Sequence, residues 1–290
     1  MPSEFIYDPS EDYSPQKDNF LTPVYFEKEV LLPFIYNPDY NCTFVSETYG
    51  ALVFEDNSIP FGINPQGHLI FWLGDINRLT PKIKGILKPY NISSDNNIES
   101  EFKQGQLDAE FTDNILEVEL FLLLNKINEE SQKRFNFKIF NSDIIPLDRL
   151  LEICSAYKRI TFNNEDDFKR IISDLNEKLI ETINRDELTS YLISKQIKVN
   201  TDLGDIKKLE ILFKEILSDD SNIIASFFYL YDLRIWATHS GGGKKFENVV
   251  KLLGLKKDSN FEEIYNCLIN QLHGSLESAL NKIKKIKKFT

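Results

Sequence analysis

The stretch DDFKRIISDLNEKLIETI, residues 166–183, decides the fold of the second half of the chain. Its apolar residues recur every three or four positions, the spacing of a helix with one buried face. They are Phe168, Ile171, Ile172, Leu175, Leu179, Ile180 and Ile183. Asn163 or Asn164 precedes the stretch and is expected to cap the helix. Apolar segments over 206–217, 222–239, 246–253 and 261–288 predict further helices with short connections. We therefore expect an all-α helical bundle over residues 146–290.

Towards the N-terminus the pattern changes from helical to alternating. β-branched and aromatic residues gather in 42–45, 51–54 and 68–73, and turn-forming residues separate these runs. This pattern predicts a β-meander. We also expect helices over 24–36, broken at Pro33, and over 115–127, with a last strand at 135–140. Residues 1–145 are thus predicted to form an α+β domain, with the boundary near residue 145.

Composition and charge narrow the class of protein. The 290 residues carry a net charge of −11, and residues 1–150 hold 12 Lys+Arg against 24 Asp+Glu. Such acidity disfavours non-specific coating of nucleic acid but is compatible with a local basic site in the second half. No apolar run approaches the ~20 residues of a membrane span, and the first residues lack the pattern of a secretory leader. Three scattered cysteines argue against disulfides, so we expect a cytoplasmic protein with no membrane contact.

Metal and cofactor chemistry finds little support in the sequence. The three histidines, His68, His239 and His273, share no ligand spacing, and no C-x-x-C or H-x-x-x-H occurs. The run Gly241-Gly242-Gly243-Lys244 lacks the spacing of a phosphate-binding loop, and a helix precedes it. We expect these glycines to end the preceding helix. We predict no metal and no cofactor.

The strongest candidate for chemistry is Arg234-Ile235-Trp236-Ala237-Thr238-His239, at the end of the most apolar predicted helix. We expect that helix to be buried, because helices that are apolar nearly all round usually are. A histidine carries protons near neutral pH, and an arginine stabilises charge on phosphoryl oxygens. The pair suits attack by a ribose 2′-hydroxyl on the adjacent phosphate, without a metal. The catalytic candidates are Arg234 and His239.

A structural interpretation of the same residues stays open. Arg234 would then pair with Asp232 or with an acid on a neighbouring helix, and His239 would cap its own helix. Geometry also matters, because positions five apart lie ~140° apart around a straight helix. The two side chains converge only if the helix loosens at its end or a second chain completes the site.

The R-x4-H motif of Arg234 and His239, at a helix end in an all-α domain, resembles the HEPN superfamily. The resemblance covers the C-terminal half. It implies a metal-independent endoribonuclease, usually dimeric, with both motifs facing a composite cleft, of the kind found in prokaryotic toxin–antitoxin and anti-phage systems. Ile235 departs from the Asn, Asp or His that often follows the arginine in this family. A non-catalytic module that binds RNA or protein is therefore the alternative, and an antitoxin-like scaffold is a further one.

These interpretations imply partners. The substrate would be RNA, with Lys244 and Lys245 contacting its phosphates. The apolar run 223–236, with Trp236 at its end, suggests a homodimer through the helical half. The acidic N-terminal half has no acid–base–nucleophile set. We expect it to sense or regulate, and to bind a protein partner, rather than to catalyse.

Overall fold

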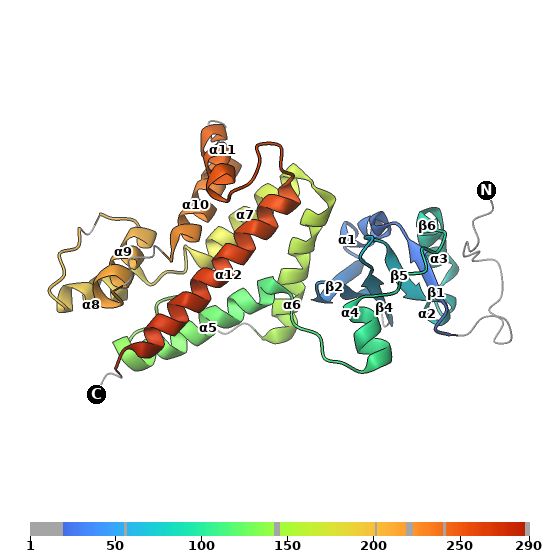
Figure 1. Cartoon of the computed structure of the whole chain (residues 1–290), viewed down its shortest axis with the longest axis horizontal. Helices are drawn as coiled ribbons and strands as arrows, with labels where there is room; N and C mark the ends of the chain where they lie inside the picture. Colours follow the sequence, from blue (N-terminus) through green and yellow to red (C-terminus); the bar gives the residue numbers. More distant parts are fainter. Residues whose placement is uncertain are drawn as a thin grey trace. The chain divides into compact units, whose positions relative to one another are not determined.

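The computed structural model describes residues 20–54, 57–141, 146–200, 202–218, 223–239 and 242–287. Contacts within the chain divide it into two compact units, labelled along the chain in Figure 1. The sheet unit comprises the chain up to Ile115 together with Leu147–Lys158, and the helical unit comprises Leu116–Pro146 together with Arg159–Thr290. The chain therefore passes between the units more than once, and not a single time near residue 145.

An antiparallel sheet of six strands forms the sheet unit, in the order β2-β3-β4-β5-β1-β6. The strands are β1 (Pro23–Phe26), β2 (Tyr40–Ser46), β3 (Tyr49–Phe54), β4 (Asn57–Ile63), β5 (Leu69–Trp72) and β6 (Asn91–Ile92). Strands β2 to β5 follow one another in sequence and in space, so the predicted meander is confirmed. Gly67 supplies the positive φ of 84° in the turn between β4 and β5, a conformation that glycine adopts without strain.

The helix expected over residues 24–36 is wrong in its first part. Residues Val24 to Phe26 belong to β1 and pair with Leu69 to Phe71 of β5. These apolar residues are buried between strands, which favours the extended form that β-branched and aromatic residues prefer. Helix α1 (Leu32–Ile35) follows, with Pro33 in its first turn. There the missing N–H of proline costs nothing, so Pro33 starts the helix and does not break it.

Short helices complete the sheet unit. They are α2 (Leu73–Asn77), α3 (Pro81–Leu87), α4 (Glu101–Lys103) and α6 (Leu147–Ser155). Phe102 of α4 is fully buried and stacks on Trp72 of β5, with ring centroids 4.8 Å apart. Helix α6 comes from a distant part of the sequence and is fixed to β2 by a hydrogen bond of 2.8 Å from the Phe44 amide to Ser155 Oγ.

The helical unit contains α5 (Leu116–Phe135), α7 (Glu165–Leu179), α8 (Arg185–Ser194), α9 (Asp205–Ile211), α10 (Ala225–Thr238), α11 (Gly243–Leu252) and α12 (Phe261–Lys285). Its two longest helices, α5 and α12, lie side by side (Figure 1). Tyr265 of α12 donates a hydrogen bond of 2.9 Å to the buried carboxylate of Glu117 on α5. The structure thus confirms a mostly helical second part.

Helix boundaries were only partly predictable. Asn164 caps α7 as expected, because its side chain accepts from the amides of Asp166 and Asp167. Helix α5 runs on to Phe135, well beyond the predicted end at residue 127. The strand predicted over 135–140 is wrong: Asn136 turns the chain with φ 64°, and Phe140 makes one isolated bridge to Ile183.

Candidate functional site

Helix α10 contains Arg234 and ends one residue before His239, and only one stripe of its surface is buried. Its buried residues form one stripe, Ser226, Phe227, Leu230 and Leu233. Phe228, Tyr231 and Arg234 follow at a spacing of three and share another face. The expectation that this helix is buried all round is therefore wrong. Its apolar composition reflects aromatic residues that remain partly open to solvent.

That open face lines a pocket of about 380 Å³, which we call the Arg234 pocket. Its polar lining residues are Asn176, Glu181, Asp205, Lys207 and Arg234, and its apolar ones are Ile180, Ile206, Phe228 and Tyr231. The residues come from α7 and the turn after it, from the start of α9, and from α10. All of them lie within the helical unit.

Arg234 is held in the pocket by a loose ion pair. Its Nη2 lies 3.8 Å from Oε1 of Glu181, and the two side chains are 36% and 53% exposed. Pairs of this exposure contribute roughly 0–1 kcal/mol. An acid on a neighbouring element therefore accompanies Arg234, as the structural interpretation expected, yet the pair is weak enough for a phosphate to compete for the guanidinium.

Asn176 of α7 is a buried member of the pocket lining. It is 1% exposed, and its Nδ2 donates a hydrogen bond of 2.9 Å to Oε1 of Glu181. This contact fixes the amide orientation, because the amino group must face the carboxylate. The buried Oδ1 accepts no hydrogen bond from any residue in the described part of the chain. A buried acceptor without a donor is uncommon in folded proteins.

His239 lies at the end of α10 and does not line the Arg234 pocket. Its backbone is extended, with φ −126° and ψ 130°, and its side chain is exposed. Its amide donates to the carbonyl of Ile235, and its own carbonyl accepts from the amide of Gly242. The chain thus leaves the helical path at His239 itself.

Lys244 and Lys245, predicted to contact RNA, occupy the first turn of α11. Lys244 is exposed, whereas Lys245 forms an ion pair with Asp232 of α10. Asp232 is therefore the partner of Lys245 and not of Arg234. Of the two lysines, Lys244 is the one whose side chain is more open to a ligand.

The glycines after His239 begin a helix instead of ending one. Gly241 lies outside the described residues. Gly242 is the N-cap of α11 with φ −78°, and Gly243 is its first residue. The prediction that Gly242 and Gly243 form a C-terminal cap is thus wrong. Gly242 is needed for close packing, since a Cβ there would lie 2.4 Å from the Cα of Trp236.

Trp236 is engaged within its own chain. It packs in an aromatic cluster with Phe168 of α7, Phe246 of α11 and Phe261 of α12, and its ring centroid is 4.5 Å from that of Phe246. Lys169 also places its Nζ 5.1 Å from the centroid of the Trp236 ring. The suggestion that Trp236 forms the core of an intermolecular interface therefore loses its main support.

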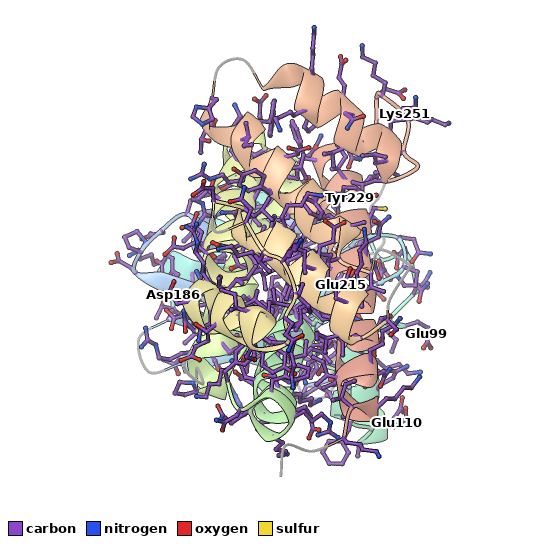
Figure 2. All side chains as sticks on the ribbon, turned by 90° about the vertical axis from the view of Figure 1, so that its left-hand side faces the viewer. Glu99, Glu110, Asp186, Glu215, Tyr229 and Lys251 are labelled. Atoms are coloured by element: carbon purple, nitrogen blue, oxygen red, sulfur yellow. The ribbon has the colours of Figure 1, made fainter. Side chains whose placement is uncertain are left out.

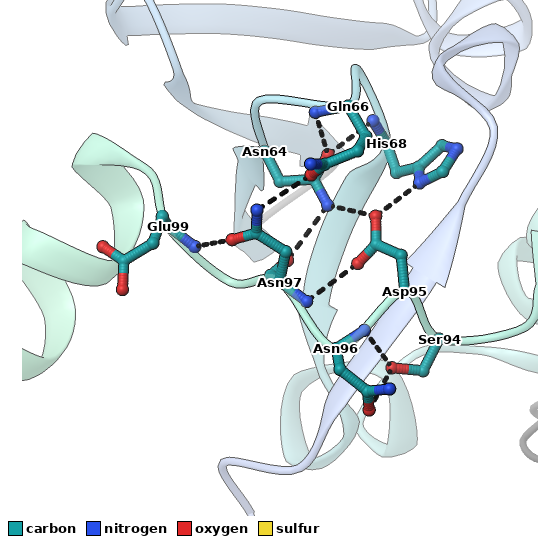
Figure 3. A network of polar contacts seen from close by, with 8 residues as sticks. All are labelled: Asn64, Gln66, His68, Ser94, Asp95, Asn96, Asn97 and Glu99. Atoms are coloured by element: carbon teal, nitrogen blue, oxygen red, sulfur yellow. Dashed lines mark hydrogen bonds and ion pairs between the residues drawn. The ribbon is translucent and has the colours of Figure 1, made fainter.

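A second polar arrangement lies in the sheet unit and was not expected from the sequence (Figure 3). His68 Nδ1 is 2.7 Å from Oδ2 of Asp95, and the same oxygen accepts a hydrogen bond of 2.7 Å from Asn64 Nδ2. Asp95 Oδ1 accepts from the amide of Asn97. The network ties the loop after β6 to the β4–β5 turn. His68 thus anchors this loop through its contact with Asp95.

Within the described ranges, no three His, Cys, Asp or Glu side chains gather in a way that could hold a metal ion. No helix in the same ranges has the length and apolar character needed to cross a membrane. Neither a family model, nor a curated protein, nor a solved structure matches this chain.

The sequence identified some residues of the site and missed others. Arg234 was found because its motif is local, and the structure assigns it to a pocket. Asn176, Glu181 and Asp205 were missed, because they join Arg234 only through the packing of α7, α9 and α10. The spacing of Phe228, Tyr231 and Arg234 was the one signal that could have revealed the pocket face.

Proposed function

We propose that the helical unit is a HEPN-like bundle that cleaves RNA without a metal ion, in the manner of prokaryotic defence and toxin effectors. One observation carries the proposal. Helix α10 presents a weakly paired arginine that lines a pocket, and an exposed histidine follows at its end. A cation for phosphate and a carrier of protons are the two groups that this reaction requires.

In the proposed reaction the ribose 2′-hydroxyl attacks the adjacent phosphorus. His239 accepts the hydroxyl proton as the O2′–P bond forms, and Arg234 stabilises the charge that builds on the phosphoryl oxygens. The P–O5′ bond then breaks, and the departing oxygen takes a proton from a second imidazole. The products are a 2′,3′-cyclic phosphate and a 5′-hydroxyl. No oxidant, reductant or cofactor enters this balance.

The second imidazole motivates a homodimer. A two-fold contact repeats each residue across its axis, so His239 of the partner subunit would supply the proton to the leaving group. Lys244, exposed beside the motif, would hold RNA phosphates, and Lys245 would do so when its pair with Asp232 opens. The acidic sheet unit would regulate access through a protein partner, because it repels RNA and brings no catalytic set.

Cleavage of labelled RNA in the presence of EDTA tests the proposal. The full chain should leave cyclic phosphate ends, and Arg234→Ala and His239→Ala should each lower the rate by on the order of 10²-fold or more. His273→Ala is the matched control, since His273 is half-buried on α12 and outside the motif. Light scattering should give a mass near twice 33.8 kDa.

Two other outcomes would contradict the proposed endoribonuclease activity. Full activity in both variants, with unchanged melting temperatures, would exclude Arg234 and His239 as catalytic residues. Binding of RNA without cleavage would favour the non-catalytic module. Its structural support is the carboxylate of Glu181 beside Arg234, together with Ile235 in the motif.

A further inference from the structure

The open face of α10 places an aromatic ring and a cation one helical turn apart. Tyr231 and Arg234 both line the Arg234 pocket, and three positions on a helix correspond to about 4.5 Å along its axis. Tyr231 is 42% exposed, and the side chain of Arg234 is 36% exposed. One ligand that lies along the helix can therefore contact the ring and the guanidinium together.

Tyr231 is the aromatic ring of this face that is open to a ligand. Phe228, one turn earlier, has Nζ of Lys207 4.8 Å from its ring centroid, and that lysine is also 2.8 Å from Oε2 of Glu210. Of the large hydrophobic side chains that are exposed in the described part of the chain, only Tyr231 lines this pocket. An exposed aromatic ring can stack on a nucleic-acid base, because every base has a π-face.

The charges around the pocket indicate which part of a ligand must supply the affinity. The lining residues include two acids, Glu181 and Asp205, and two bases, Lys207 and Arg234. The acids offset the attraction of the bases for phosphate, so charge alone does not hold RNA there. Glu181 lies 3.8 Å from Arg234, and a phosphate that reaches the guanidinium must compete with this loose pair. We therefore expect stacking on Tyr231 to contribute the larger share of binding in this pocket.

We propose that Tyr231 stacks on one unpaired base of the RNA while Arg234 contacts the phosphate attached to the same nucleotide. The inference rests on the proposed function, because the phosphate on Arg234 is taken to be the one that is cleaved. The volume of about 380 Å³ lies at the lower end for small-molecule sites and fits a single nucleotide. Stacking does not read the edge of a base, so the pocket should accept purines and pyrimidines alike.

A consequence is that the RNA must be single-stranded at the cleaved position. Within a duplex each base is already covered on both faces by its neighbours, so it cannot also stack on Tyr231. Unpaired bases can turn outward and stack on an aromatic side chain. Tyr231 would therefore make the proposed enzyme select unpaired RNA without selecting a sequence.

Binding is measured with the full chain carrying His239→Ala, so that the RNA stays intact. Fluorescence anisotropy compares a labelled RNA of mixed sequence as a single strand and after annealing to its complement. The single strand should bind about tenfold more tightly, and adding Tyr231→Ala should weaken its binding about tenfold. Tyr231→Phe should bind like the parent protein, because the ring and not the hydroxyl makes the contact. Equal binding by Tyr231→Ala and its parent, or weak binding by Tyr231→Phe, would overturn the proposal.

Tyr229→Ala is the matched control for the loss of a tyrosine from the same helix. Tyr229, labelled in Figure 2, belongs to α10 but not to the pocket lining. Two positions correspond to ~200° around a helix, so Tyr229 and Tyr231 leave α10 on different sides. Tyr229→Ala should bind the single strand as tightly as its parent. A loss as large as that of Tyr231→Ala would show that the effect does not come from the pocket, and would refute the assignment.

RNA that lacks a single base locates the contact relative to the cleaved phosphate. With an abasic ribose on one or the other side of that phosphate, one of the two substrates should be cut about tenfold more slowly than intact RNA. Tyr231→Ala should cut that substrate and intact RNA at the same reduced rate, since the partner of the missing base is already gone. Cleavage that depends neither on the base nor on Tyr231 would reject the inference and leave the endoribonuclease standing. Binding that depends on Tyr231, without any cleavage, would keep the stacking site and reject the proposed activity.

Discussion

At the scale of single residues, Asp95 shows how one carboxylate organises a loop. Partial desolvation acts to raise the pKa of Asp95. Even so, hydrogen bonds from the Asn97 amide, His68 and Asn64 bring it below its ordinary value of 3.8. These donors favour the charged form, so the folded state holds the ionised carboxylate more strongly than the unfolded chain does. The loop after β6 is fixed to the β4–β5 turn by a charge, and acid should release it.

The sign of the pH dependence follows from the lowered pKa. Asp95 contributes its full stability above the unfolded-state value and loses it as the pH falls through the folded-state value. We expect Asp95→Ala to lower the free energy of unfolding by about 1–3 kcal/mol near neutral pH, because three donors lose their acceptor. The difference between the two proteins should shrink below pH 4. Urea midpoints measured between pH 7 and pH 2.5 check this, and a difference that grows in acid would contradict it.

The positions of single residues also explain which parts of the candidate site could be predicted from the sequence and which could not. Arg234 and His239 stand in a local motif, so composition and spacing were enough to select them. Asn176 lies 58 positions before Arg234 and has no distinctive neighbours. It belongs to the pocket lining only because of how α7, α9 and α10 pack. In the same way His68 and Asp95 are 27 residues apart and meet only through the sheet.

At the scale of elements, the contact between α10 and α11 depends on a residue without a side chain. Gly242 lies against the backbone of Trp236, which lets α11 bring Phe246 into the aromatic cluster with Phe168 and Phe261. A methyl group at Gly242 would lie 2.4 Å from a backbone atom that cannot move without bending α10. The same contact therefore fixes both the end of α10, where His239 follows, and the start of α11, which contains Lys244.

Gly242→Ala and Gly243→Ala form a matched pair of variants. The first should destabilise the protein by about 1–3 kcal/mol, the usual cost of forcing extra atoms into a packed contact. The second places its methyl where no atom lies within 4 Å, in the first turn of α11. Because alanine favours helix over glycine, it should be neutral or slightly stabilising. Urea unfolding of both variants checks the expectation. Equal stability would show that α11 adjusts without strain.

Helices and strands were predicted correctly where the hydrophobic periodicity was strong. They were predicted wrongly where the local pattern and contacts with distant residues favoured different structures. Residues 166–183 have a clear helical period and a capping asparagine, and α7 follows that prediction closely. Residues 24–26 are equally apolar, yet their partner strand β5 lies more than 40 positions away, so pairing could not be inferred locally. Residues 128–135 look polar, but Asn128 and Ser131 are buried and make hydrogen bonds to the backbone of Phe140 and Ile139, and the helix continues to Phe135.

At the scale of the whole molecule, the two units share the chain in an interleaved way. Helix α5 precedes α6, yet α5 packs with α12 in the helical unit and α6 packs with β2 in the sheet unit. A boundary at residue 145 assumed that sequence order and spatial order agree. Local patterns of charge and hydrophobicity cannot reveal such an exchange, because an apolar helix face does not specify the core against which it packs.

Fragments of the protein test this interleaving. A fragment of residues 146–290 lacks α5 and leaves the apolar face of α12 uncovered, so we expect it to aggregate or to show little cooperative unfolding. A fragment of residues 116–290 restores α5 and should retain strong helical circular dichroism and a sigmoidal urea transition. A well-folded 146–290 fragment, with the same unfolding midpoint as 116–290, would show that α5 is dispensable.

The pairing of α5 with α12 has a further consequence, for the protein during its synthesis. About 125 residues separate the end of α5 from the start of α12. At 5–20 residues per second, a ribosome needs on the order of 10 s to cover that distance. Throughout this interval the nascent α5 has an apolar stripe and no permanent cover, while the sheet can already close once α6 has emerged. The helical unit must therefore fold last. We expect its first helices to bind a chaperone at the ribosomal exit tunnel until α12 has been synthesised.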